Sequence, residues 1–213
     1  MPRRSHLGIA IAALINLTAC GPHGGVETAA APRASADWRS TATAADRERL
    51  RNWRAAWVSA LAQAKFAADL NRIKAEGALL KPDAALADAD LPEGRYKCRV
   101  IKLGSQSNTG RPFTAYPAYD CRVDDEGDLH GFSKVGGSQR PVGVLFPGGD
   151  TRQVFLGTLM LGDETRAIEY GQDTERDMAG VVERVGPNKW RLVLPYPRFE
   201  SVLDVIELVP VTG

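Results

Sequence analysis

The C-terminal half of the sequence is a succession of short apolar segments broken by turn residues, and this pattern limits the fold more than any other feature. The segments lie between positions 93 and 210, and clusters of Gly, Pro, Asn and Asp separate them. Pro147-Gly148-Gly149-Asp150 is one such cluster and Gly186-Pro187-Asn188-Lys189 is another. Consecutive segments with short connections are typical of antiparallel strands joined by hairpins. We therefore expect a mainly β (α+β) domain.

Eight strands are predicted in this region. Their approximate residue ranges are 95–103, 115–123, 129–135, 141–146, 153–161, 178–185, 190–194 and 202–209. Eight antiparallel strands in about 115 residues form either a sandwich or a closed barrel. Closure removes the exposed edge strands at which chains aggregate, so we favour a small, lipocalin-like β-barrel over residues 93–210.

A helical region precedes the predicted strands, over residues 37–80. Thr43 and Asp46 fit the start of a helix, because the threonine hydroxyl can accept a free backbone N–H and an acid is favourable in the first turn. Apolar residues then recur at spacings of three and four, which predicts an amphipathic helix or helix pair lying across the barrel. This apolar stripe consists of Leu50, Trp53, Trp57, Leu61 and Ala64. It is interpreted as a face that docks on the barrel, with a partner-binding surface as the alternative.

Two cysteines in the first two predicted strands suggest a covalent link between them. Cys98 shares a strand face with Tyr96, and Cys121 shares a face with Tyr119 and Val123. If the strands form a hairpin with the cysteines directly opposite each other, Arg99 faces Asp120 and the tip lies at Thr109-Gly110. Directly opposed residues are close enough for a disulfide, so we predict a Cys98–Cys121 bond. Two buried thiols are the alternative.

The N-terminus has the layout of a secretory signal. Arg3 and Arg4 precede an apolar stretch of about a dozen residues, which is shorter than the roughly 20 residues that a transmembrane helix needs. The stretch ends in Leu17-Thr18-Ala19-Cys20, which resembles the lipobox of bacterial lipoproteins. This resemblance implies that residues 1–19 are a signal peptide, and that the chain is cleaved before Cys20 and held on the membrane by lipid on that cysteine.

The cysteine count and the next segment agree with this interpretation. The chain has three cysteines. Lipidation of Cys20 leaves two for a disulfide in an oxidising compartment. Residues 20–36 are rich in Gly, Ala and Pro and are interpreted as a flexible tether to one globular domain, residues 37–213. Removal of two arginines with residues 1–19 changes the formal net charge from +1 to −1. The sequence contains no basic patch that predicts nucleic-acid binding.

The sequence motifs of common enzyme mechanisms are missing, so we predict a non-enzyme with no catalytic residues, no metal ligands and no cofactor. His130 is the one histidine after residue 36, and it follows a turn where a structural role is expected. There is no Gly-x-Ser-x-Gly or His-Glu-x-x-His pattern. Carboxylates are frequent, but none of the possible pairs is favoured as a glycosidase pair. The polar segment Gly171–Met178 is interpreted as a solvated loop that ends in an ion pair.

The chain also resembles an uncharacterised envelope-protein family of Gram-negative bacteria, known as a domain of unknown function, from about Asp37 to Pro210. The family implies no catalytic or binding residues. The segments that carry the resemblance are Asp37-Trp38-Arg39, Asp46–Leu50, Ala75–Asp83, Tyr96–Gly104, Arg176–Arg184, Trp190–Pro195, Phe199-Glu200-Ser201 and Leu203-Asp204.

Several functions remain open at this point. A small anchored barrel can hold an apolar or amphipathic ligand, or its own side chains can fill it. By analogy of architecture with small periplasmic lipoproteins that inhibit lysozyme, it can instead bind an envelope protein. A purely structural role is a third possibility. The expected location is the cell envelope, facing the periplasm. Gly21 stands where an aspartate retains many lipoproteins in the inner membrane, so the outer membrane is favoured.

Overall fold

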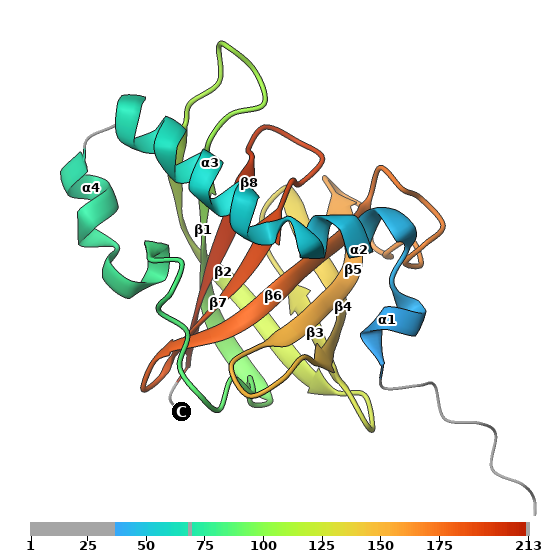
Figure 1. Cartoon of the computed structure of the whole chain (residues 1–213). Coiled ribbons are helices and arrows are strands. Elements are labelled where there is room, and N and C mark those ends of the chain that lie inside the picture. The colour runs from blue at the N-terminus through green and yellow to red at the C-terminus, as the bar shows by residue number, and fades with distance from the viewer. Residues whose placement is uncertain (1–36, 68–69, 212–213) are drawn as a thin grey trace, which may run out of the picture. The chain divides into compact units, whose positions relative to one another are not determined.

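The structure is a computed structural model that describes residues 37–67 and 70–211. The predicted signal peptide, Cys20 and the tether therefore lie outside the described residues. Eight strands form one closed antiparallel sheet in sequence order, and β8 pairs with β1 to complete the barrel (Figure 1). This confirms the predicted barrel. The strands are β1 (Gly94–Leu103), β2 (Phe113–Asp125), β3 (His130–Lys134), β4 (Gln139–Pro147), β5 (Gln153–Leu161), β6 (Asp177–Gly186), β7 (Lys189–Pro195) and β8 (Leu203–Pro210).

The helical region consists of short helices that precede the barrel. Thr43 caps α2 as predicted, because its hydroxyl accepts the backbone N–H of Asp46 at 3.1 Å. The predicted long helix is interrupted at Asn52, which ends α2 with a φ of −95° and a ψ of 7°, outside the helical region. The helices are α1 (Trp38–Thr41), α2 (Ala44–Arg51), α3 (Trp53–Ala67), α4 (Leu70–Ala75) and the 3₁₀ helix η1 (Gly77–Leu80).

Helices α2 and α3 pack on the outside of the barrel, α2 on β6 and α3 on β1, β7 and β8 (Figure 1). The predicted stripe is the docking face. Trp57 and Ala64 are completely buried, Leu50 and Leu61 are nearly so, and Trp53 is half-buried. These side chains contact the outward residues of the strands, including Val193 and Val205, in one continuous apolar cluster. Loss of a fully buried tryptophan side chain costs about 3–5 kcal/mol, so Trp57 is a principal anchor of the helices.

Apolar side chains fill most of the barrel interior. Phe132 and Phe155 meet edge to face with ring centroids 5.8 Å apart, and Tyr96 and Trp190 meet in the same way at 6.5 Å. Edge-to-face contacts of this kind add to the free energy of burial. Most of the barrel interior is therefore packed with side chains and is not hollow.

The segment that enters β1 closes one end of the barrel. Leu91 is completely buried among the interior side chains, and its backbone N–H donates to Gln153 at 3.1 Å. The indole N–H of Trp190 donates to the carbonyl of Asp90 at 3.0 Å. The Tyr96 hydroxyl donates to the carbonyl of Pro92 at 2.5 Å. This segment plugs the end of the barrel, and these bonds satisfy the polar atoms that it would otherwise leave buried and unpaired.

Cys98 and Cys121 form the predicted disulfide, with their Cα atoms 5.8 Å apart. The predicted register was wrong by two residues, because Cys98 pairs with Tyr119 and Cys121 pairs with Tyr96. The bond therefore crosses the hairpin diagonally. A shift of two residues leaves every side chain on the same face of the sheet, so the apolar pattern cannot distinguish the two registers.

The shift in register also changes the predicted charge pairing and the turn. Asp120 accepts from Lys97 at 2.6 Å and not from Arg99. Arg99 instead forms ion pairs with Glu76 and with Glu207 of the neighbouring strand β8. The loop centre moves from Thr109-Gly110 to Asn108, midway between the paired residues Leu103 and Phe113.

Candidate functional site

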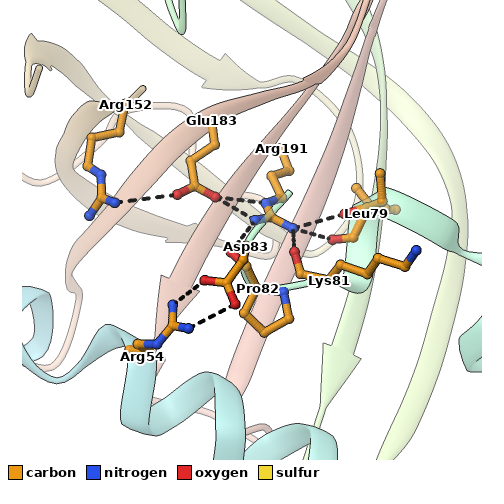
Figure 2. A network of polar contacts seen from close by, with 9 residues as sticks. Arg54, Leu79, Lys81, Pro82, Asp83, Arg152, Glu183 and Arg191 are labelled. Atoms are coloured by element: carbon orange, nitrogen blue, oxygen red, sulfur yellow. Dashed lines mark hydrogen bonds and ion pairs between the residues drawn. The ribbon is translucent and has the colours of Figure 1, made fainter. Parts of the chain in front are cut away.

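A completely buried arginine on the outside of the barrel holds the chain that follows η1. The Arg191 guanidinium on β7 bonds Glu183 on β6 at 2.6 and 2.9 Å. Its remaining N–H groups donate to the backbone carbonyls of Ala78, Leu79, Lys81 and Pro82 (Figure 2). Its charge lies over the Trp57 ring. Burial lowers the pKa of Arg191, although Glu183 opposes that shift. All five donors have protein acceptors, so this network is structural and has no donor to offer a ligand.

A second polar cluster joins α2 to the loop that precedes β6. The buried carboxylate of Asp46 accepts from the Tyr170 hydroxyl at 2.6 Å and from Arg49 at 2.5 Å. Asp177 is buried at the start of β6 and accepts from the backbone of Gly171 at 2.8 Å. Burial raises the pKa of Asp177. These contacts anchor the loop to the helix, and Arg176 of the same segment forms an ion pair with Glu164 at 3.0 Å.

The histidine and the glycine-rich segments have structural positions. His130 is half-buried at the start of β3 and pairs with Asp125 of β2, at the end of the barrel that is closed. The segments around Gly136-Gly137 and Gly148-Gly149 connect β3 to β4 and β4 to β5, as hairpin turns. No cluster of three or more potential metal ligands exists in the described ranges.

The other end of the barrel is open, and there the lumen becomes polar. This mouth lies where β1, β3, β5 and β7 end, and the loops around it are residues 104–112, 135–138, 162–176 and 196–202. Lys102, Lys134 and Asp204 point into the lumen here, in phase with the apolar interior residues of their strands. We refer to these three residues with Gln139 and Tyr119 as the mouth cluster.

Two adjoining pockets lie at the mouth. The outer pocket has a volume of about 130 Å³, and its walls include Lys102, Lys134, Tyr119 and Glu200. The inner pocket has a volume of about 30 Å³ and is lined mainly by apolar side chains, among them Leu159, Met178, Leu194 and Ile206. Val100 and Gln139 belong to the walls of both, so the two pockets share a boundary.

Lys102 is a buried cation with carboxylate partners. Its ammonium lies 3.3 Å from Asp204 and 3.1 Å from Glu200, and it donates to the side chain of Gln139 at 3.0 Å. Burial acts to lower the pKa of Lys102, but the two carboxylates outweigh it and the pKa is raised. Asp204 also accepts from the Ser201 hydroxyl, and burial raises the pKa of Asp204.

Lys134 is buried differently, because neutral groups surround its ammonium. It donates to the backbone carbonyls of Gly136 and Gln139, the second at 3.1 Å, and it lies 4.3 Å from the centre of the Tyr119 ring. Burial, followed by repulsion from Arg140 and Lys102, lowers the pKa of Lys134 to about 8. Carbonyl oxygens and the face of an aromatic ring both attract a cation, but neither neutralises its charge.

The mouth cluster was not predicted from the sequence, although one signal for it was present. Lys102 follows Tyr96, Cys98 and Val100 in the alternation of β1, and Lys134 follows Phe132 in β3. A lysine at an inward position of a barrel strand contradicts the apolar pattern, and such contradictions are concentrated at functional sites. The depth of each lysine and the identity of its partners depend on residues from other strands.

The fold and site define a small closed β-barrel with one plugged end, one polar mouth and a helical cover on its outer face. The chain belongs to the family described as a domain of unknown function, DUF4893, whose model matches residues 38–208. A search of curated proteins finds no significant match. Within the described residues, no helix combines the length and the apolar character that a membrane span requires.

Proposed function

We propose that this protein is a lipid-anchored, periplasmic and non-enzymatic barrel that binds a small ligand at its mouth. The observation that carries the proposal is the contrast between the two ends of the lumen. One end is plugged by Leu91 and packed with aromatic rings, whereas the other has two adjoining pockets lined by polar and apolar groups. A concave site with an apolar part and a few convergent polar groups is the usual form of a small-molecule site.

The proposed location is supported by sequence features. A signal-like segment ends at Cys20, and Cys98 and Cys121 form the disulfide, which leaves Cys20 as the one cysteine for lipid. Disulfides persist in oxidising compartments such as the periplasm. A lipoprotein with two or three acyl chains would be held stably on its membrane, which we propose to be the outer membrane.

Native mass spectrometry of the full chain purified from its own envelope tests ligand binding. The expected result is a low-mass ligand that leaves on denaturation. Val100→Trp, which places an indole in the wall shared by both pockets, should abolish the bound species. Leu86→Trp, at an exposed position before the barrel, is the matched control and should retain it. Absence of any ligand from wild type, with no small molecule that raises its melting temperature, would remove the proposal.

The anchor is tested separately. Cys20→Ser should prevent both acyl labelling and cleavage of the signal, because the thiol is the atom that receives the lipid. Cys98→Ser should still be labelled, since that cysteine is not the acceptor. Normal acyl labelling of Cys20→Ser would contradict the anchor without affecting the binding proposal.

A second candidate function is favoured by exposed apolar residues on the helices. Val58 and Phe66 of α3 and Leu70 of α4 are large apolar residues with exposed side chains, and Phe66 is 96% exposed. Exposed apolar surface of this kind marks protein-binding sites. A protein-binding envelope factor such as a lysozyme inhibitor would slow lysozyme lysis, and Phe66→Ser would weaken that effect while Leu86→Ser would not. An unchanged lysis rate with wild type would exclude lysozyme as the partner.

A further inference from the structure

Three cationic side chains in the described part of the chain are buried, and one of them differs from the other two. Arg191 bonds Glu183, and Lys102 bonds Asp204 and Glu200. Lys134 is only 4% exposed, yet among the described residues it forms no ion pair with a carboxylate. A buried charge is costly unless an opposite charge lies beside it, so the missing partner of Lys134 requires an explanation.

The surroundings of Lys134 are built closely around its ammonium. A Cβ atom on Gly137, which has φ +84°, would lie 2.8 Å from the Lys134 Nζ, and a Cβ on Gly136 would lie 2.9 Å from the Tyr119 ring. Glycine at 137 permits the positive φ of the β3–β4 turn, and the missing Cβ atoms at both positions leave room for the lysine and the tyrosine. The glycines, Tyr119 and the carbonyls thus hold the ammonium in place at the wall of the outer pocket.

The two pockets differ in chemistry and in size. The outer pocket has Lys134 and Lys102 in its wall, and the inner pocket is mainly apolar. A cavity needs about 10–15 Å³ to hold a single water, so the inner pocket, at about 30 Å³, has room for an apolar group of two or three atoms. The matching ligand is short and amphipathic, with a charged head near the lysines and an apolar end directed past Val100.

We propose that the mouth binds a small monocarboxylate, whose carboxylate group is the counterion of Lys134 and whose short apolar end enters the inner pocket. This inference rests on the proposed function and names its ligand class. Carboxylates are the partners of the other two buried cations, and Glu200 at the rim disfavours ligands with more negative charge. Lys102 contributes a second positive charge near the carboxylate of the ligand, while Asp204 holds Lys102 in position.

Ligand-observed NMR titrations of the full chain in neutral detergent test this inference with three probes: butyrate, its neutral amide butyramide, and inorganic phosphate. We expect butyrate to bind at least ten-fold more tightly than butyramide and phosphate. Lys134→Met should reduce butyrate affinity to the level of the amide. Lys134→Gln, which keeps donors for the two carbonyls, provides the same test if the methionine variant does not fold. Lys97→Met removes an exposed lysine that pairs with Asp120 and should leave the affinity unchanged.

The outcomes separate the inference from the proposed function. Equal binding of butyrate and butyramide, with no effect of either Lys134 variant, would overturn the carboxylate assignment but leave a ligand-binding barrel. Phosphate binding as tight as that of butyrate would also overturn it. Failure of every probe, together with absence of a co-purified ligand from the wild type, would remove both proposals. Loss of butyrate binding in Lys97→Met would show that the affinity is not specific to the mouth.

Discussion

Lys102 and Lys134 project from strands β1 and β3 and bond the same residue, Gln139. Lys102 donates to the Gln139 side chain at 3.0 Å, and Lys134 donates to its backbone carbonyl at 3.1 Å. One residue at the start of β4 thus positions two positive charges at the mouth. Like charges at short range repel, and this repulsion contributes to the lowered pKa of Lys134. The fold tolerates that repulsion at the open end of the lumen.

The charge on Lys134 should destabilise the folded protein at neutral pH. Its folded pKa of about 8 lies below the ordinary value of 10.5, so between these values the unfolded chain binds more protons. Wild-type stability should therefore rise with pH across this window by up to about 3 kcal/mol relative to Lys134→Met and Lys134→Gln. Arg140 and Lys102 disfavour the charged form, while Tyr119 and the carbonyls favour it. Denaturant unfolding from pH 7 to 10.5 gives the difference, and parallel curves for all three proteins would contradict it.

The Arg191–Glu183 pair should be essential to the docking of the chain after η1. Arg191→Met leaves buried Glu183 with only Arg152, at 4.0 Å, as a cationic neighbour and removes donors from four carbonyls. Loss of a buried partner costs about 3–5 kcal/mol. Arg191→Met combined with Glu183→Met should cost less than the sum of the two single variants. Arg122→Met breaks an exposed pair with Asp124 and should change the unfolding free energy by under about 1 kcal/mol. If Arg191→Met and Arg122→Met lowered the unfolding free energy equally in urea titrations, burial would not be what makes the Arg191–Glu183 pair stabilising.

The disulfide should stabilise the barrel through the unfolded state. Cys98 and Cys121 are 23 residues apart, and closing a loop of that size removes about 3 kcal/mol of chain entropy. Replacing both cysteines with alanine should lower the free energy of unfolding by about that amount, as should reduction of the wild type. The double variant should be insensitive to reductant in the same thermal melt. A melting temperature of wild type that does not change with reductant would contradict the predicted contribution.

Gly157 should not tolerate even alanine. A Cβ at this position would lie 2.2 Å from the backbone oxygen of Val142 and 2.6 Å from the Phe155 ring. Since backbone on the paired strand β4 cannot move freely, Gly157→Ala should cost more than about 2 kcal/mol. Gly186→Ala, whose Cβ would come no closer than 3.3 Å to Lys189, is the control. Thermal melts of the two variants compare them, and equal melting temperatures would contradict the close packing of β4 on β5.

The sequence determined the order and type of the elements. Alternation and turn residues predicted eight strands, of which Gln153–Leu161 has the predicted bounds, and the stripe around Trp57 predicted the docking face of the helices. It also predicted the Cys98–Cys121 bond. Some of these features are local, and the others depend on which face of an element is apolar. Both can be predicted because the residues of a single segment contain the necessary information.

Only the tertiary structure decided the register, the buried pairs and the site. A two-residue slip preserves every face, so the choice between Arg99–Asp120 and Lys97–Asp120 depended on the whole barrel, including Glu207 of β8. The mouth cluster brings together residues from β1, β2, β3, β4 and β8, and its electrostatics depend on burial that no single strand determines. The absence of a carboxylate partner for Lys134 among the described residues is a property of this assembled mouth, because it depends on where every neighbouring charge lies.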